Sequence, residues 1–261
     1  MRHFRLNKLK MWRGIRFFGF VLVLTVILGL DSSFAAPPSL PKSAVSQCRE
    51  ASETKNTKSS APDYSQVRLI SQYPELPNGC EATSLAMVLT AAGCQIDAVT
   101  LYEDYMPRQE LELTAEGFIT GPDPEEFYAG DAESVTDGWY CFEGPVIRAA
   151  NDYLADCKSQ YSAVSVTGLS QAQLEEYVVS GTPVITWVTI DYGTPIYSQA
   201  YWILADGREY YPYENLHCVV LTDIDDGWYV IADPMGSWVE LPPEIFWNSF
   251  EEMGCRAVVI E

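Results

Sequence analysis

The sequence predicts an α+β fold with an N-terminal helical half and a C-terminal antiparallel sheet. Two observations support the helical half: apolar residues recur at helical spacing after Cys80, and two further stretches before residue 180 carry helix-start signals. A third observation supports the sheet, because runs rich in Val, Ile, Trp and Tyr occur beyond residue 183.

The first predicted helix begins next to Cys80 and ends before Gly93. Apolar residues keep helical spacing over 85–92, and Gly93 suits the C′ position that stops a helix. Asn78 is a good N-cap, and Glu81 three residues later completes a capping box. Cys80 is then the second residue of a buried helix.

Two more helices and three strands follow from the same signals. A helix is predicted over Glu143–Leu154, where Pro145 suits the N1 position. Ser170 is the expected N-cap of a helix that extends to Val179. The C-terminal sheet is predicted to use residues 183–190, 217–224 and 228–233.

Residues 1–35 are predicted to be a secretory signal peptide. A basic start is followed by an apolar run of 14 residues, Phe17–Leu30, and by small residues that include Ser33 and Ala35. This is the order of a signal with its cleavage site, and a cut there releases Ala36. The run is shorter than the ~20 residues that span a bilayer. We therefore expect the remainder to be secreted or at the cell surface, and an uncleaved N-terminal anchor is the alternative.

The exported part is predicted to consist of a linker and one domain. Residues 36–63 are rich in Pro, Ser, Lys and Thr and have almost no large apolar side chains, which is typical of a flexible linker. Aromatic and aliphatic residues are dense over 64–261. These roughly two hundred residues are enough for one domain with a full core.

The chain is strongly acidic outside its first 35 residues. Its 261 residues include 16 basic and 36 acidic side chains, a formal charge of −20, and without the signal segment the charge is −25. Such a surface repels phosphate backbones, which excludes nucleic acid as a partner. The two histidines are His3 and His217, so loss of the signal leaves one and excludes a zinc site built on paired histidines. We expect no metal, no cofactor and no stable membrane partner beyond the signal segment.

Cys80 differs from the other six cysteines in its position at a helix start. Unpaired backbone N–H groups and the positive end of the helix dipole favour a thiolate there, although the charge of Glu81 opposes part of that effect. The alternative is a small residue chosen for packing next to Gly79. The pairing of the other cysteines stays open, and Cys218 and Cys255 are expected to be buried as small apolar residues.

A cysteine nucleophile requires an imidazole that a third polar group orients, and the only candidate imidazole is His217. His217 opens one predicted strand and Asp233 closes the next, with the hairpin signal Asp225-Asp226-Gly227 between them. If the loop comprises three residues, His217 and Asp233 lie on the same face of the hairpin. A two-residue turn shifts the pairing and puts them on opposite faces. The catalytic interpretation therefore predicts the longer loop.

Two segments carry no chemical motif. The tyrosine-rich stretch 191–216 is interpreted as a hairpin whose aromatic side chains pack on the sheet, with a substrate-contacting loop as the alternative. The acidic segment Glu103–Asp137 has no EF-hand pattern and is interpreted as a solvated insertion.

Gln72, the stretch Gly79-Cys80-Glu81-Ala-Thr-Ser-Leu85, His217 and the pair Asp233-Pro234 follow one another in an order that resembles a known family. These are the bacterial papain-like cysteine peptidases of the branch related to bacteriocin-exporter peptidase domains, cysteine peptidase family thirty-nine. The resemblance covers most of residues 64–261 and implies a papain-like fold. It does not extend to plant-type enzymes, because their Cys-Gly-Ser-Cys-Trp signature is absent.

The resemblance also implies a role for each residue. Cys80 matches the nucleophile, His217 the general base and acid, and Asp233 the residue that orients the imidazole. Gln72 matches the side-chain donor to the oxyanion that forms during acyl transfer. The implied function is an exported cysteine peptidase that acts on a peptide or protein substrate. The alternatives are a cell-wall peptide amidase or transpeptidase, and a non-catalytic surface module that binds a ligand on the same fold.

Overall fold

The computed structural model describes residues 67–261. The predicted signal peptide over 1–35 and the predicted linker over 36–63 lie outside the described residues, as do the first three residues of the predicted domain. Among the residues that are described, no helix has both the length and the apolar character needed to cross a membrane.

A six-stranded antiparallel sheet forms the centre of the described part, in the order β11–β10–β9–β6–β12–β5. The three predicted strands are confirmed as β6 (Val184–Thr189), β9 (Leu216–Asp225) and β10 (Trp228–Asp233). Three further strands were not predicted, because runs of three to five residues are too short for alternation to stand out. They are β5 (Ala163–Ser165), β11 (Ser237–Leu241) and β12 (Ala257–Ile260).

Among residues 67–261, three of the four longer helices coincide with the predicted ones: α2 (Cys80–Ala91), α4 (Glu143–Asp156) and α5 (Gln171–Val179). Ser170 caps α5 in a capping box with Gln173. Gly93 follows α2 with a φ of +87°, as expected of a C′ residue. Pro145 is the third residue of α4 rather than the first. The unpredicted elements are α6 (Pro243–Glu252), the short helix α3 (Ala98–Thr100) and the π-helical turn η2 (Leu101–Tyr105).

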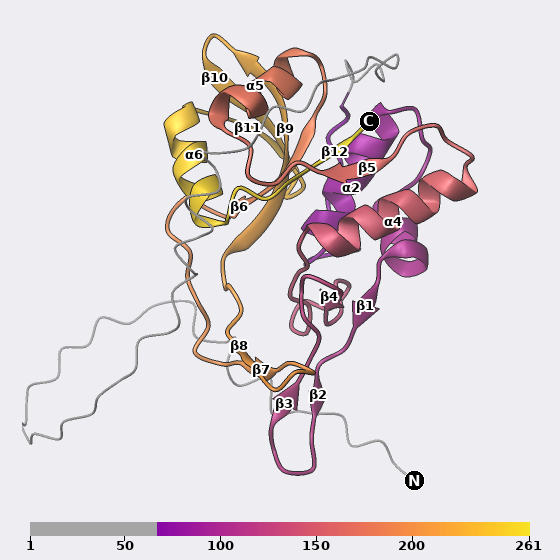
Figure 1. Ribbon diagram of the computed structural model, residues 1–261, viewed down its shortest axis with the longest axis vertical. Helices are drawn as coiled ribbons and strands as arrows, with labels where there is room; N and C mark the ends of the chain where they lie inside the picture. Colours follow the sequence, from indigo (N-terminus) through magenta and orange to yellow (C-terminus); the bar gives the residue numbers. More distant parts are fainter. Residues whose placement is uncertain (1–66) are drawn as a thin grey trace, which may run out of the picture. The chain divides into compact units, whose positions relative to one another are not determined.

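Helices cover both faces of the central sheet, α2 and α4 on one side and α5 and α6 on the other (Figure 1). Side chains alternate between the faces along β9. Cys218 and Val220 belong to the core under α2 and α4, whereas Val219 and Leu221 belong to the core under α5 and α6. All four are fully buried, which explains why the start of β9 reads as a continuous apolar run.

Two small sheets extend from the central one (Figure 1). One pairs β1 (Arg108–Gln109) with β4 (Tyr128–Ala129), and the other joins β2 (Glu112–Leu113), β3 (Ile119–Thr120), β7 (Trp202–Ile203) and β8 (Glu209–Tyr210). The tyrosine-rich stretch is therefore a hairpin, as predicted, and it packs on the large sheet only in part: Tyr213 belongs to the core under α2 and α4, whereas Trp202 belongs to a small separate core. The buried Trp202 contacts Trp139, with ring centroids 5.7 Å apart.

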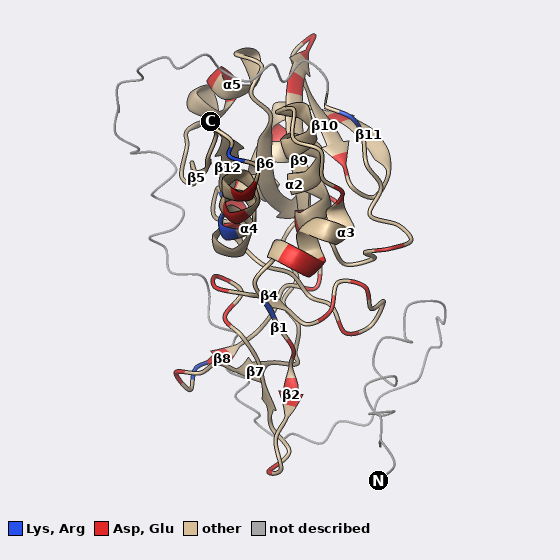
Figure 2. Cartoon of the chain, turned by 90° about the vertical axis from the view of Figure 1, so that its right-hand side faces the viewer, with Lys and Arg blue, Asp and Glu red and all other residues tan. Residues whose placement is uncertain are grey.

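The acidic segment Glu103–Asp137 is only partly solvated. Tyr128 and Ala129 are buried within it, and the hydroxyl of Tyr128 donates to the carbonyl of Asn78 at 2.8 Å, directly before α2. Acidic side chains occur over helices, strands and loops, whereas Lys and Arg occupy few positions (Figure 2). One of these cations, Arg256, pairs with Glu143 at 2.6 Å and stacks 3.8 Å from the ring of Phe142.

The β9–β10 hairpin differs from the prediction in its turn. Asp225 pairs with Trp228, so the turn has two residues, Asp226 and Gly227, with φ values of +46° and +82°. Positive φ at both positions is the geometry of a type I′ turn. The predicted three-residue loop is therefore wrong. The register then shifts by one between Val230 and Ile231, where β9 carries a bulge.

Candidate active site

Cys80 is the first residue of α2 and follows a tight turn. The turn requires Gly79, because a Cβ at that position lies only 2.6 Å from the Cβ of Leu76. The N-cap is Gly79, without a side-chain hydrogen bond, so the predicted capping box of Asn78 and Glu81 is wrong, and Cys80 is the first rather than the second helical residue. This arrangement brings the thiol to the end of the helix where backbone N–H groups have no helical partner.

Asn78 connects this turn to the acidic segment instead of capping the helix. Its side-chain nitrogen donates to the carbonyl of Ser134 at 2.6 Å, and its backbone N–H donates to the carbonyl of Ala132 at 3.1 Å. A polar side chain with a tertiary partner of this kind is not available as a helix cap. The segment thus fixes the chain directly before Cys80.

The Cys80 thiol is buried, with 7% of the residue exposed. It donates to Oε2 of Glu81 over 3.4 Å. Burial, followed by the charge of Glu81 and the nearby Cys218 thiol, raises the pKa of Cys80 well above its ordinary value, and the Cys218 N–H acts in the opposite direction. The expected lowering of this pKa at a helix start is therefore wrong, because burial and the carboxylate outweigh the backbone N–H groups.

Glu81 is fully buried beside the thiol. Its Oε1 accepts the backbone N–H of Cys141 at 3.1 Å. Burial raises the pKa of Glu81 to about 7, although hydrogen bonds from its own backbone, from Cys141 and from Cys80 favour the charged form. A carboxyl group with such a pKa changes its charge close to neutrality.

His217 and Asp233 form a buried pair across the β9–β10 hairpin. Nε2 of His217 lies 2.8 Å from Oδ1 of Asp233, which also accepts the backbone N–H of Met235 at 2.8 Å. Burial acts to raise the pKa of Asp233, but the hydrogen bond and charge of His217 and the Met235 N–H outweigh it and lower that pKa. An ionised Asp233 only accepts hydrogen bonds, so Nε2 of His217 is the donor of this bond.

The hairpin pair and the helix start lie close together. The backbone N–H of Cys218, the residue that follows His217, acts to lower the pKa of the Cys80 thiol, so the two residues are neighbours. The hydroxyl of Ser84, one turn further along α2, donates to the carbonyl of Cys218 at 3.1 Å and fixes the helix on β9. The charges of Cys80 and of Asp233 both contribute, after burial, to a raised pKa of Tyr73, so this tyrosine lies near both.

Gln72 lies beside the same strand end. Its backbone N–H donates to the carbonyl of Pro234 at 2.7 Å, and its side-chain Nε2 donates to the carbonyl of Pro77 at 2.8 Å. Gln72 is buried, and its Oε1 has no hydrogen-bond partner. The amide nitrogen carries two hydrogens, so one remains beyond the bond to Pro77.

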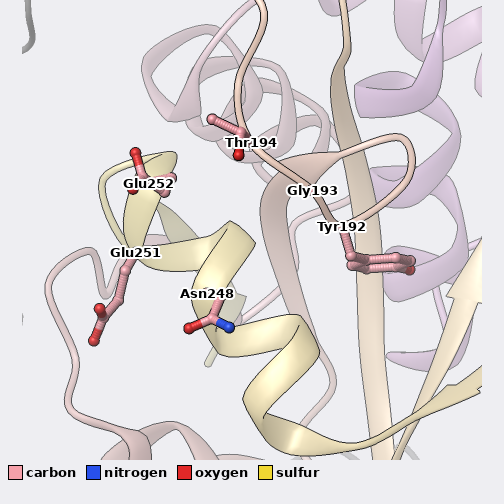
Figure 3. Close-up of a pocket in the computed structure, with 6 residues that line it drawn as sticks. All are labelled: Tyr192, Gly193, Thr194, Asn248, Glu251 and Glu252. Atoms are coloured by element: carbon pink, nitrogen blue, oxygen red, sulfur yellow. The ribbon is translucent and has the colours of Figure 1, made fainter.

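A separate cavity of about 330 Å³ lies between the loop after β6 and the C-terminal part of α6 (Figure 3). It is lined by Tyr192, Gly193, Thr194, Asn248, Glu251 and Glu252. None of the predicted site residues lines it. Burial and the charge of Asp233 raise the pKa of Tyr192, so its side chain extends towards the hairpin pair. Within residues 67–261, no three His, Cys, Asp or Glu side chains form a group that could hold a metal ion.

Two neighbours of the site were not identified from the sequence. Tyr73 is half exposed. Its position directly after Gln72 is the one feature of the sequence that could have indicated a place near the site. Tyr192 lies in a loop far from the motifs and adopts a φ of +52°. Of the two cysteines expected to be buried apolar residues, Cys218 is an unpaired buried thiol, whereas Cys255 is buried but disulfide-bonded.

Comparison with known proteins gives one family and close relatives. The model of the family described as "Peptidase_C39 like family" matches residues 64–258. The uncharacterized protein YvpB of Bacillus subtilis (strain 168) is 31% identical over 189 residues, which cover 72% of this chain and 71% of the relative. The crystal structure of a provisionally assigned C39-like peptidase from Bacillus anthracis is 29% identical, with a TM-score of 0.64 over 76% of this chain and 95% of that chain. The predicted α+β, papain-like fold is confirmed by this structural match.

Proposed function

Because the chain belongs to the peptidase C39-like family, we propose that it is an exported cysteine peptidase that hydrolyses peptide or amide bonds. In this proposal Cys80 is the nucleophile, His217 the general base and acid, Asp233 the residue that orients the imidazole, and Gln72 a donor to the oxyanion. The substrate is a peptide or protein outside the cytoplasm, at the cell surface or in the medium.

The observation that carries the proposal is the hydrogen bond of 2.8 Å between His217 and Asp233 next to a cysteine at a helix start. A nucleophile, a base and a third group that orients the base constitute the general arrangement for covalent acyl transfer. The bond to Asp233 uses Nε2, so Nδ1 is the nitrogen that accepts the proton of Cys80.

The proposed reaction proceeds in two halves. His217 takes the proton of Cys80 while the sulfur attacks the substrate carbonyl carbon, and the carbonyl oxygen becomes negative. The backbone N–H of Cys80 and the second hydrogen of the Gln72 amide donate to that oxygen. His217 then protonates the leaving amine, and a thioester remains on Cys80. Water, whose proton His217 accepts, hydrolyses the thioester, and the thiol regains its proton from His217.

The raised thiol pKa determines the resting state of this mechanism. At neutral pH the proton stays on the sulfur, so the reactive thiolate forms only when His217 receives the proton. The resulting thiolate–imidazolium pair is stabilised by the Asp233 carboxylate on the far side of the ring.

A combined cleavage and labelling experiment tests the proposal. The purified chain is incubated with a peptide library that includes cell-wall peptides, and the products are identified by mass spectrometry. In parallel, iodoacetamide labelling near pH 7 is quantified for each cysteine by peptide mapping, because Cys157 is exposed and Cys94 is partly exposed. We expect cleavage, and we expect Cys80→Ala to abolish both cleavage and the label at position 80.

The matched control is Cys157→Ala, which removes an exposed thiol and should leave cleavage unchanged. Turnover that persists in Cys80→Ala contradicts the mechanism. Cleavage of cell-wall peptides alone, or transfer of their acyl group to an added amine, identifies the narrower amidase or transpeptidase activity.

One observation favours a second function, a non-catalytic binding module. A thiol that is both buried and shifted to a high pKa is a poor nucleophile unless a base takes its proton. The labelling experiment separates the two functions: a Cys80 that reacts no faster than Cys141, which is fully buried, favours the binding module.

A further inference from the structure

We infer that Glu81 controls the reactivity of Cys80: as a neutral acid it donates a hydrogen bond to the sulfur and permits the thiolate, and as a carboxylate it suppresses the thiolate. This inference concerns the site of the proposed peptidase and rests on that function for its biological meaning. Its test below needs no substrate.

Each carboxyl oxygen of Glu81 has a polar partner on another residue. Oε1 accepts the backbone N–H of Cys141 at 3.1 Å, and Oε2 lies 3.4 Å from the sulfur of Cys80. A backbone N–H is always a donor, so Oε1 is always an acceptor. A proton on Glu81 therefore resides on Oε2, where it points at the sulfur.

No positively charged side chain faces Glu81 that could stabilise a carboxylate on Glu81 and a thiolate on Cys80 at the same time. The titratable side chains that face Glu81 are the thiols of Cys80, Cys141 and Cys218 and the phenol of Tyr128, from α2, the segment before α4, β9 and β4. None is a cation, and Glu81 belongs to none of the ion pairs among the described residues. A carboxylate and a thiolate in hydrogen-bond contact repel each other strongly in such a fully buried place.

The proton inventory follows from this repulsion. The reactive state has a thiolate on Cys80, a proton on both nitrogens of His217 and a proton on Glu81. When Glu81 loses its proton, the Cys80 sulfur takes back the proton held by His217. The resulting thiol then donates a hydrogen bond to the Glu81 carboxylate, as in the contact of 3.4 Å. Reactivity therefore decreases as the pH rises through the pKa of Glu81, about 7, whereas an ordinary thiol becomes more reactive with rising pH.

The test is the rate of Cys80 alkylation by iodoacetamide between pH 5 and 9, measured by peptide mapping in the otherwise unmodified chain and in Glu81→Gln. The carboxamide keeps the size of the side chain and an N–H donor but never ionises. At pH 8 Glu81 is about tenfold more often charged than neutral, so we expect Glu81→Gln to react about tenfold faster. Near pH 5.5 the two rates should agree within about twofold, because Glu81 is then protonated.

The matched control is Glu240→Gln, which removes a carboxylate from an exposed position on β11 and should leave the alkylation profile unchanged. The unmodified chain provides a second test that does not depend on the folding of a variant: its Cys80 rate should decrease between about pH 6.5 and 8. The inference is overturned if the Cys80 alkylation rate rises continuously with pH and is the same in the unmodified chain and in Glu81→Gln. A chain that cleaves no peptide but shows the decrease and its removal by Glu81→Gln supports the role of Glu81 while contradicting the proposed peptidase activity.

Discussion

His217 and Asp233 are hydrogen-bonded at 2.8 Å although the turn that joins their strands has two residues. A regular hairpin with this turn puts the two side chains on opposite faces. The bulge in β9 supplies the missing residue: beyond it Ile231 pairs with Leu221, one position out of step with the pairs next to the turn. Beyond the bulge, on the side of His217 and Asp233, the strands therefore pair as they would after a three-residue loop. The extra residue lies in strand β9 instead of in the loop.

Deletion of Thr222 should leave the site intact. Thr222 is the residue of β9 without a partner on β10, and its hydroxyl donates to the carbonyl of Val230 at 2.9 Å. Without it, the pairs on both sides of the bulge join in one regular ladder, and β9 does not pair with β6 beyond Leu221. We expect Cys80 labelling and cleavage within about threefold of the parent chain, with about 1 kcal/mol less stability from the lost hydrogen bond. A folded variant, verified by circular dichroism, that lacks labelling contradicts this account of the register.

Replacement of His217 by Ala should abolish hydrolysis. Without the imidazole no group takes the proton from a thiol whose pKa is raised, so we expect a loss of at least about a thousandfold in kcat/KM. The measurement is cleavage of the best substrate from the library, together with Cys80 labelling, which should also decrease. Asp206→Asn, on an exposed loop, is the control. Labelling that is unchanged in His217→Ala would show that the histidine does not activate the thiol.

Asp233→Asn should lower activity and change the pH dependence of stability. The pKa of Asp233 is lowered in the folded state, so the ionised side chain stabilises the fold above the pKa of the unfolded chain, about 4, and this contribution is lost as the pH falls through the folded value. Loss of a charged hydrogen bond costs about 1.5–3 kcal/mol. Denaturant unfolding at pH 7 should reveal that difference between the two proteins, and the difference should shrink below about pH 4. A difference that stays constant down to pH 3 contradicts the assignment of this carboxylate.

Gln72→Ala should reduce turnover more than it reduces thiol reactivity. If the second amide hydrogen stabilises the oxyanion, kcat decreases by about a hundredfold or more, which corresponds to about 3 kcal/mol. Alkylation of Cys80 does not depend on an oxyanion donor and should change by less than about threefold. Gln72→Glu, which retains the size but lacks the donor, serves as the comparison. Equal losses in both assays indicate that Gln72 acts through the fold, for example through its bond to Pro77.

Local patterns were sufficient for the longer elements. The apolar spacing after Cys80, Pro145 near the start of the second helix and the N-cap at Ser170 predicted three helices that are present. The β-rich runs beyond residue 183 predicted three strands that are present. The short strands of the two small sheets were not predictable, since each has only two residues, and the pairs β1–β4 and β3–β7 join segments that are distant in the chain. The same reason explains Asn78, whose cap-like pattern is overridden by a bond to Ser134, 56 positions later.

The sequence by itself determined which residues the site has to use. His217 is the only histidine apart from His3, so the sequence pointed to His217, the cysteine at the helix start and the aspartate at the strand end as the set that fits this chemistry. Only the tertiary structure decided the charge state of that set. Register depends on where an unpaired residue is placed, and the pKa values of Cys80 and Glu81 depend on burial and on neighbours from β9 and from the segment before α4. These are long-range properties, because solvent is excluded and charges are brought together only when distant segments pack.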